Sequence, residues 1–332
     1  MSTVMDKPDL LEVKHCKVWF DIAGKGLWKR RKQTLKAVDD ISFTLQAGET
    51  LGVVGESGCG KSTLVRGILG LETVTAGNII LNGEELTSLD KKSFRSRRRN
   101  MQIIFQDPLA SLDPRMTVSE IIGEPLQAFH PELSSKQRKQ KVQQIMQRVG
   151  LLPNQINRYP HEFSGGQAQR IGIARALILE PKLLICDEPV SALDVSIQAQ
   201  IINLLMELQR EMGISMIFIA HDLSVVKHIS QRVMVMYMGK VVEMASRDEL
   251  FRHPRHHYTW ALMQSIPIPD PVIERAKRGA PLKGDLPSPM SPPSGCNFHT
   301  RCPKAQEICS NTAPEWSEIA ADHWVACHFP IP

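Results

Sequence analysis

The sequence predicts an α/β fold built on a parallel sheet, with its functional residues at the ends of the strands. Short apolar runs at residues 51–54 and 183–186 indicate buried strands, and a helical pattern follows each of them along the chain. Polar residues stand directly after these runs. Because a parallel sheet binds its ligands at the carboxyl edge, these residues are the first candidates for function.

The amino-acid composition limits which classes of protein the chain can belong to. The 332 residues suffice for one large domain plus an extension or for two domains, and 42% apolar with 23% charged residues is typical of a soluble globular protein. No apolar run approaches the roughly 18–20 residues of a membrane-spanning helix, and the charged N-terminus lacks the apolar core of a signal peptide. We therefore expect a cytoplasmic chain. The net charge of +5 does not indicate nucleic-acid binding.

The remaining elements follow from hydrophobic periodicity. Strands are expected at residues 10–20, 37–54, 78–81, 101–105, 183–186 and 216–220, with a hairpin at 233–237 and 240–244. Helices are expected at 168–179 and 195–212, and the polar, helical character of 113–150 indicates an inserted helical subdomain. The basic stretch 25–32 predicts a solvated loop, with proximity to lipid headgroups as a secondary possibility. The proline-rich segment after Trp260 predicts extended structure.

A glycine-rich motif lies between the strand at 51–54 and the helical pattern of Leu64, Ile68 and Leu71. Its residues are Gly55, Glu56, Ser57, Gly58, Cys59, Gly60, Lys61, Ser62 and Thr63. An ordinary glycine turn is the alternative, but the full G-x-x-x-x-G-K-S spacing in this context favours a phosphate-binding P-loop. Backbone N–H groups and the helix N-terminus would hold phosphates, Lys61 would reach the β- and γ-phosphates, and Ser62 would bind Mg²⁺. The motif predicts nucleoside triphosphate binding.

Three further strand ends carry polar residues that suit triphosphate chemistry. Asp187 would hold Mg²⁺ together with Ser62, and Glu188 could accept a proton from the attacking water. His221 could contact the γ-phosphate and orient that water, and Gln106 could reach the metal or the water. Each has a plain structural alternative, such as a carboxylate capping a turn. Their occurrence together behind a P-loop favours the catalytic interpretation.

A second glycine motif consists of Ser164, Gly165, Gly166 and Gln167. It offers N–H groups and a hydroxyl at the start of a helix, which suits an anion, although a plain N-cap explains it as well. If two such domains pack head to tail, the P-loop of one and this motif of the other would enclose each nucleotide.

The motifs together resemble those of an ABC transporter ATPase. In chain order, residues 55–63, Gln106, 163–167, 183–188, 191–194 and His221 match the family's Walker A, Q-loop, signature, Walker B, D-loop and H-loop. The resemblance implies ATP contacts from Asp194 and from Phe20, which lies where the family often carries an adenine-stacking aromatic; Trp19 is its rival.

Longer stretches at residues 105–112, 158–164 and 187–196 resemble the ATPases of bacterial oligopeptide and dipeptide importers, most nearly the F-type subunit. The resemblance implies a P-loop NTPase (RecA-like) core with an antiparallel β subdomain, a helical subdomain at about 108–170 and an irregular, cysteine-containing C-terminal extension. The expected domains are residues 1–260 for nucleotide binding and 261–332 for the extension.

The same resemblance implies ATP-driven peptide import. The expected partners are a second ATPase subunit, taken to be a paralogue, two transmembrane permease subunits and a periplasmic or extracellular peptide-binding protein, with the chain on the cytoplasmic face of the inner membrane. Nickel, glutathione or murein peptides are alternative solutes. A soluble ABC ATPase acting on nucleic acid or ribosomes is a further alternative, disfavoured by the single cassette and the lack of sustained heptads.

The extension also carries a cysteine cluster of Cys296, Cys302, Cys309 and Cys327. Its spacing does not follow the paired C-x2-C pattern of common zinc ribbons. Four thiolates suit a [4Fe–4S] cluster or structural zinc, and His299, His323 or His328 could replace one ligand. Free thiols are the third possibility. Similar cysteine tails occur in the peptide-importer ATPases, some of which hold an iron–sulfur cluster.

Overall fold

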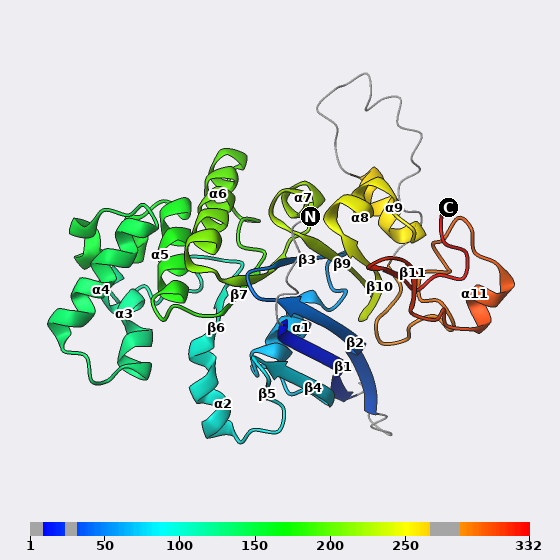
Figure 1. Ribbon diagram of the computed structural model, residues 1–332, viewed down its shortest axis with the longest axis horizontal. Coiled ribbons are helices and arrows are strands. Elements are labelled where there is room, and N and C mark those ends of the chain that lie inside the picture. Colours follow the sequence, from blue (N-terminus) through cyan, green and yellow to red (C-terminus); the bar gives the residue numbers. More distant parts are fainter. Residues whose placement is uncertain (1–8, 24–31, 266–283, 285) are drawn as a thin grey trace, which may run out of the picture. The chain divides into compact units, whose positions relative to one another are not determined.

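The computed structural model describes residues 9–23, 32–265, 284 and 286–332 (Figure 1). The chain divides into two units, of which the first comprises residues 45–50 and 88–220 with residues 9–10. The second comprises residues 11–44, 51–87 and 221–332, as far as they are described. Among the described residues, no helix has the length and apolar character that crossing a membrane requires.

The first unit is built on three parallel strands, β6 (Met101–Ile104), β7 (Leu183–Asp187) and β8 (Ser215–Ile219). Strand β7 lies in the middle, where Cys186 pairs with Ile104 on one side and Phe218 on the other. Every residue of β7 and β8 is buried. Because a parallel sheet is covered on both faces, its strands are continuous apolar runs, and this is why the sequence pattern identified them.

The helices of the first unit begin at strong local signals. Helices α3 (Val118–Phe129), α4 (Ser135–Arg148) and α5 (Gly165–Leu177) each start with a capping box, formed by Thr117 with Glu120, Ser134 with Gln137 and Ser164 with Gln167. These three helices pack on one another as the predicted helical subdomain (Figure 1). Helices α2 (Lys91–Arg97) and α6 (Val195–Met212) and short 3-10 turns at 98–100, 153–157 and 160–162 complete the unit.

The second unit contains the predicted antiparallel subdomain. Its strands β1 (Asp9–Ala23), β2 (Lys32–Gln46), β4 (Ala76–Leu81) and β5 (Glu84–Glu85) form a sheet in the order β2-β1-β4-β5. Strand β4 pairs antiparallel with both β1 and β5. The tight turn between β4 and β5 is at Asn82 and Gly83, both with positive φ, as the Asn-Gly signal predicts.

The C-terminal extension contributes strands to the second unit. Strand β3 (Thr50–Val54) pairs parallel with β9 (Arg232–Tyr237), and β10 (Lys240–Ser246) pairs antiparallel with β9. The next strands outward are β12 (His323–Val325) and β11 (Ser317–Ala320), neither of which the sequence analysis predicted. The unit's helices are α1 (Lys61–Ile68), α7 (Leu223–Ile229), α8 (Arg247–Arg252), α9 (His257–Gln264) and α11 (Glu307–Asn311).

Two sequence predictions need correction. The strand expected at residues 37–54 is two strands, because a turn at residues 47–48, with Gly48 at a φ of 73°, separates β2 from β3. The helix expected at 168–179 spans Gly165–Leu177 instead, because the capping box of Ser164 fixes its start three residues earlier. The predicted loop at 25–32 lies, apart from residue 32, outside the described residues, as do 266–283 and 285 of the proline-rich segment.

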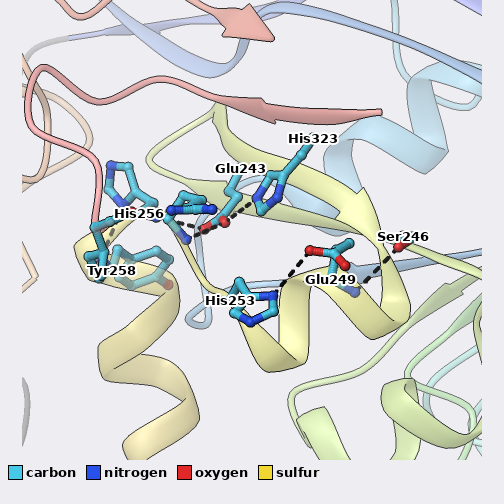
Figure 2. Close-up of polar contacts among 9 residues, drawn as sticks. Glu243, Ser246, Glu249, His253, His256, Tyr258 and His323 are labelled. Carbon is cyan, nitrogen blue, oxygen red and sulfur yellow. Dashed lines mark hydrogen bonds and ion pairs between the residues drawn. The ribbon is translucent and has the colours of Figure 1, made fainter. Parts of the chain in front are cut away.

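A fully buried carboxylate joins the extension to the hairpin of β9 and β10 (Figure 2). Glu243 accepts hydrogen bonds from the backbone N–H groups of Arg255 (2.6 Å) and His256 (2.9 Å) and pairs with the His323 ring at 2.8 Å. A buried carboxylate is tolerated only when it is bonded in this way. Glu243 therefore fixes both the start of α9 and strand β12 against β10.

We expect Glu243→Gln to lower the free energy of unfolding by about 3 kcal/mol, because the amide cannot satisfy all three donors and loses the charge. Urea denaturation measures the loss. The matched control is Glu249→Gln, which alters an exposed pair with His253 in the same region (Figure 2). The control should have the same free energy of unfolding as the wild type. Equal stability of the two variants would contradict the role of Glu243.

Candidate functional site

The backbone of the glycine-rich motif adopts the conformations that a P-loop requires. Gly55, Gly58 and Gly60 have φ values of 149°, 77° and 107°. A Cβ atom on Gly55 would collide with the carbonyl oxygen of Met236, and one on Gly60 with that of Ala37. Only glycine combines these φ values with such close approach of other backbone. The two glycines are therefore required by geometry.

Lys61 is folded into this loop. Its side chain is buried, and Nζ donates to the carbonyl oxygens of Gly55 (2.7 Å) and Glu56 (3.2 Å). Ser57 and Gly58 are exposed, and Ser62 and Thr63 are half-buried on the first turn of α1. No side chain caps α1, whose N-cap is Gly60. A helix start of this kind presents N–H groups and a positive dipole to an anion.

Burial makes the thiol within this loop unreactive. Cys59 is 1% exposed, and burial raises its pKa above the usual value for a thiol. Its sulfur lies 3.9 Å from Nζ of Lys61. The side chain therefore fills space behind the loop as a neutral group.

In the first unit, the structure brings two predicted catalytic residues together. Gln106 follows β6, and its amide Nε2 donates to the Glu188 carboxylate at 3.0 Å. Asp187, the last residue of β7, is buried, whereas Glu188 adopts a φ of 49°. A residue other than glycine in the left-handed region is strained, and such strain concentrates at functional sites. The backbone N–H of Glu188 holds the turn by donating to Ile219 of β8 at 3.1 Å.

The signature motif is the capped start of α5. The Ser164 hydroxyl accepts from the Gln167 N–H at 3.4 Å, and the Gln167 side chain accepts from the Ser164 N–H at 3.1 Å. Gly165 and Gly166 pack under Leu193 and Ile197, so that a Cβ on Gly166 would lie 2.6 Å from an Ile197 methyl carbon. Asp194, between those two residues, is the exposed N-cap of α6. The signature and D-loop motifs are therefore in contact within one unit.

The other predicted contacts lie in the second unit with the P-loop. His221 is exposed. Phe20 and Trp19 are both half-buried, and the Trp19 ring has the ammonium groups of Lys36 at 4.6 Å and Lys17 at 5.8 Å from its centroid. The choice between the two aromatics as the adenine-stacking residue stays a prediction. The catalytic role of His221 stays a prediction as well.

The predicted cysteine cluster converges on one cavity. Cys296, Cys302, Cys309 and Cys327 line it, together with His256, His257, Phe298, His299, Lys304, His328 and Phe329. Burial raises the pKa of Cys327 to about 11 and also raises those of Cys296 and Cys302. Within the described parts of the chain, no group of three or more Cys, His, Asp or Glu side chains has the arrangement of a metal site. The donor set fits a cluster or zinc, but its present arrangement is not a ligand set.

The sequence analysis missed two residues that contact the P-loop, Tyr258 and Arg301. The Tyr258 hydroxyl accepts from the backbone N–H of Glu56 at 2.8 Å, and Arg301 pairs with the Glu56 carboxylate at 2.6 Å and 2.9 Å. Both contacts join residues more than 200 positions apart. No spacing or periodicity signals a contact of that range.

Two family models match the chain. Residues 38–191 match the family described as ABC transporter, and residues 242–309 match the family described as oligopeptide/dipeptide transporter, C-terminal region. A solved structure, the dimer of an ATP-binding cassette in a post-hydrolysis state bound to ADP and phosphate, aligns with a TM-score of 0.64 at 26% identity. That alignment covers 71% of this chain and 98% of the cassette.

Curated relatives match almost end to end. The oligopeptide transport ATP-binding protein OppF of Haemophilus influenzae is 59% identical over 98% of this chain and 99% of its own length. OppF of Salmonella typhimurium is 60% identical over 98% of both. Identity at this level over whole chains establishes the family and, with it, the predicted fold and the ATPase activity. The chain belongs to the ABC transporter ATPases, among the oligopeptide transport ATP-binding proteins.

Proposed function

We propose that the chain is the ATP-hydrolysing subunit that powers import of oligopeptides or dipeptides through an ABC transporter. The observation that carries this proposal is the 60% identity to an oligopeptide transport ATP-binding protein over 98% of both chains. The match to the C-terminal region of oligopeptide/dipeptide transporters supports the same solute class. In this proposal residues 1–260 form the nucleotide-binding domain and residues 261–332 the extension.

The P-loop residues 55–63 would bind the triphosphate. The loop supplies N–H groups around the phosphates, and Lys61 is close enough to exchange its bonds with loop carbonyls for bonds to phosphate oxygens. A flat aromatic side chain, Phe20 or its neighbour Trp19, would cover the adenine. The assignment of residues 55–63 as the phosphate-binding loop is supported by its geometry, because its glycines permit close backbone approach.

Hydrolysis would use the predicted metal-binding and catalytic residues. The hydroxyl of Ser62, the amide of Gln106 and the carboxylate of Asp187 are oxygen donors that suit Mg²⁺, which neutralises charge developing on the phosphates. Glu188 would accept the proton of the attacking water, and His221 would orient that water at the γ-phosphate. The hydrogen bond from Gln106 holds the Glu188 carboxylate in place and supports this division of roles.

A second subunit would complete each site. The signature residues Ser164, Gly165, Gly166 and Gln167, with Asp194, would contact the nucleotide held by the partner's P-loop. The dimeric state of the cassette structure that aligns with this chain supports the arrangement. ATP binding would close the pair of subunits, and hydrolysis would reopen it. We propose a paralogue as the second subunit.

The transporter would contain two transmembrane permease subunits and a periplasmic or extracellular peptide-binding protein. The chain would attach to the permeases at the cytoplasmic face of the inner membrane. In this arrangement the loop after Gln106 would couple the nucleotide site to a permease helix. Substrate choice would lie in the permeases and the binding protein.

We propose further that Cys296, Cys302, Cys309 and Cys327 hold a [4Fe–4S] cluster, with structural zinc as the alternative. Their shared cavity and four-sulfur donor set support the proposal. Binding would require the thiols to lose their protons and to close around the metal. The bound metal would help to order residues 296–327, where few apolar side chains are buried, namely those of Phe298, Cys309 and Val325.

Replacing Glu188 with glutamine should reduce phosphate release by the assembled transporter at least about 100-fold, because the amide cannot accept the proton of water. The dissociation constant for ATP should stay within about threefold of the wild type, because the P-loop is unchanged. The matched control is Glu207→Gln, at an exposed position of α6 that should hydrolyse ATP normally. Normal turnover by the Glu188 variant would remove this residue from the mechanism.

Deleting the gene should abolish uptake of a radiolabelled tripeptide, and the wild-type chain should restore it while Glu188→Gln does not. The tagged chain, purified from membranes, should bring down two permease subunits and a second ATPase. These results follow from the coupling of hydrolysis to transport. Undiminished tripeptide uptake, or co-purification with ribosomes or nucleic acid in place of permeases, would contradict the proposed function.

The chain purified without oxygen should be coloured and contain iron, and Cys309→Ser should lose both, because a thiolate ligand is removed. Visible absorption measures the colour, and metal analysis measures the iron content. Cys16→Ser, at a buried thiol outside the cavity, is the matched control and should keep the colour. A colourless preparation with stoichiometric zinc would replace the cluster with zinc, and a metal-free one would leave four free thiols.

A further inference from the structure

A partly buried ion pair connects the C-terminal extension to the P-loop. Arg301 donates from Nη1 and Nη2 to the two carboxylate oxygens of Glu56, at 2.6 Å and 2.9 Å. The Arg301 side chain is 5% exposed and that of Glu56 is 26% exposed. A bidentate arginine–carboxylate pair that is largely shielded from water is among the strongest polar contacts in proteins. It also fixes the orientation of both groups.

Besides this ion pair, three hydrogen bonds of its backbone fix the position of Glu56. Its backbone N–H donates to the Tyr258 hydroxyl at 2.8 Å. Its carbonyl oxygen accepts from the Cys59 N–H and from Nζ of Lys61, both at 3.2 Å. All polar groups of Glu56 are thus engaged, and one of their partners is the lysine that the P-loop presents to phosphate. A shift of Glu56 would therefore move Lys61.

The turn that carries Arg301 is anchored by an aromatic cluster. The rings of Tyr237, Tyr258 and Phe298 pack with centroids 4.7–5.4 Å apart. The backbone N–H of Arg301 donates to the carbonyl of Phe298 at 3.0 Å, so the cluster anchors the turn that carries the arginine. Because the backbone at Arg301 is anchored in this way, its conformational entropy does not have to be lost again when the side chain binds Glu56.

From these contacts we propose that Arg301 is a positioning residue of the nucleotide site, through which the C-terminal extension holds Glu56, and with it Lys61, in place for the triphosphate. The proposal rests on ATP binding at the P-loop and goes beyond it, because it assigns a function in ATP binding to a residue of the extension. A second consequence concerns charge. Arg301 neutralises a carboxylate that would otherwise repel the phosphates bound beside it.

The test measures ATP affinity of the full-length chain by titration with a fluorescent ATP analogue and competition with ATP. Arg301→Ala should raise the dissociation constant about tenfold, because a bond to a charged group is lost. Arg301→Lys keeps the positive charge but cannot form the bidentate bond, and it should raise the dissociation constant about threefold. In the assembled transporter, KM for ATP should rise while kcat stays within about twofold, because Arg301 does not touch the reacting atoms.

The double variant separates positioning from general damage to the fold. Adding Glu56→Gln to Arg301→Ala removes the unpaired carboxylate, so the double variant should bind ATP more tightly than Arg301→Ala alone. A merely structural loss in the extension would not be rescued in this way. The matched control is Arg255→Ala, which removes another half-buried arginine of the second unit, one that donates to the Ile331 carbonyl at 2.9 Å. Its ATP affinity should stay within about twofold of the wild type.

Equal ATP affinity of the wild type and Arg301→Ala would overturn the proposal, as would an equal loss in Arg255→Ala. Failure of the wild type itself to bind ATP would overturn the P-loop assignment on which the proposal rests. If Arg301→Ala does not fold, as judged by circular dichroism, Arg301→Lys and Glu56→Gln decide the matter. An unchanged dissociation constant in both would then overturn the role of Arg301.

Discussion

The conformation of the loop between β3 and α1 depends on one interaction, the bonds from the ammonium group of Lys61 to two loop carbonyls. Gly55 and Glu56 direct their carbonyl oxygens inward, and the lysine satisfies both. Without the lysine, the Gly55 carbonyl would lose this bond and the Glu56 carbonyl would keep only the Cys59 N–H, at a free-energy cost comparable to lost hydrogen bonds. In the proposed function the same charge that stabilises the loop would meet the phosphates, so loop stability and nucleotide binding would share one group.

The C-terminal extension is an integral part of the fold. Strand β12 continues the sheet beyond β10, and the buried Glu243 bonds to both β12 and the start of α9. Helix α9 in turn carries Tyr258, whose hydroxyl accepts from the P-loop. Burial lowers the pKa of His256 to about 4, so the ring is neutral at physiological pH and its Nδ1 can accept the Tyr258 N–H. A continuous set of buried polar contacts therefore leads from the extension to Glu56.

Local signals explain what could be predicted from the sequence. The P-loop, the strands β7 and β8 and the helix α6 follow from short-range patterns, because glycine spacing, apolar runs and helical periodicity need no knowledge of distant residues. The break at Gly48 was missed although glycine is a turn signal, because apolar alternation continues on both sides of it. The positions of Gln106 and Glu188 at strand ends made them candidates, and the sheet places the two side chains in contact.

No local sequence pattern predicts the contacts of Arg301 and Glu243. Each joins segments far apart in the chain, and an arginine between two cysteines or a glutamate in an alternating strand is an ordinary occurrence on a protein surface. Strands β11 and β12 are equally hidden, since they are short and lie in a stretch whose prolines and cysteines favour irregular structure. Tertiary context alone decides these positions.

The two interpretations of Ser164, helix cap and anion ligand, do not exclude each other. A serine side chain has one donor and two acceptor positions. Capping α5 uses only an acceptor, since the hydroxyl oxygen receives the Gln167 N–H. In the proposed function the O–H donor would bind an anion at this helix start, where the dipole also favours negative charge. Helix capping and phosphate binding are therefore compatible in one residue.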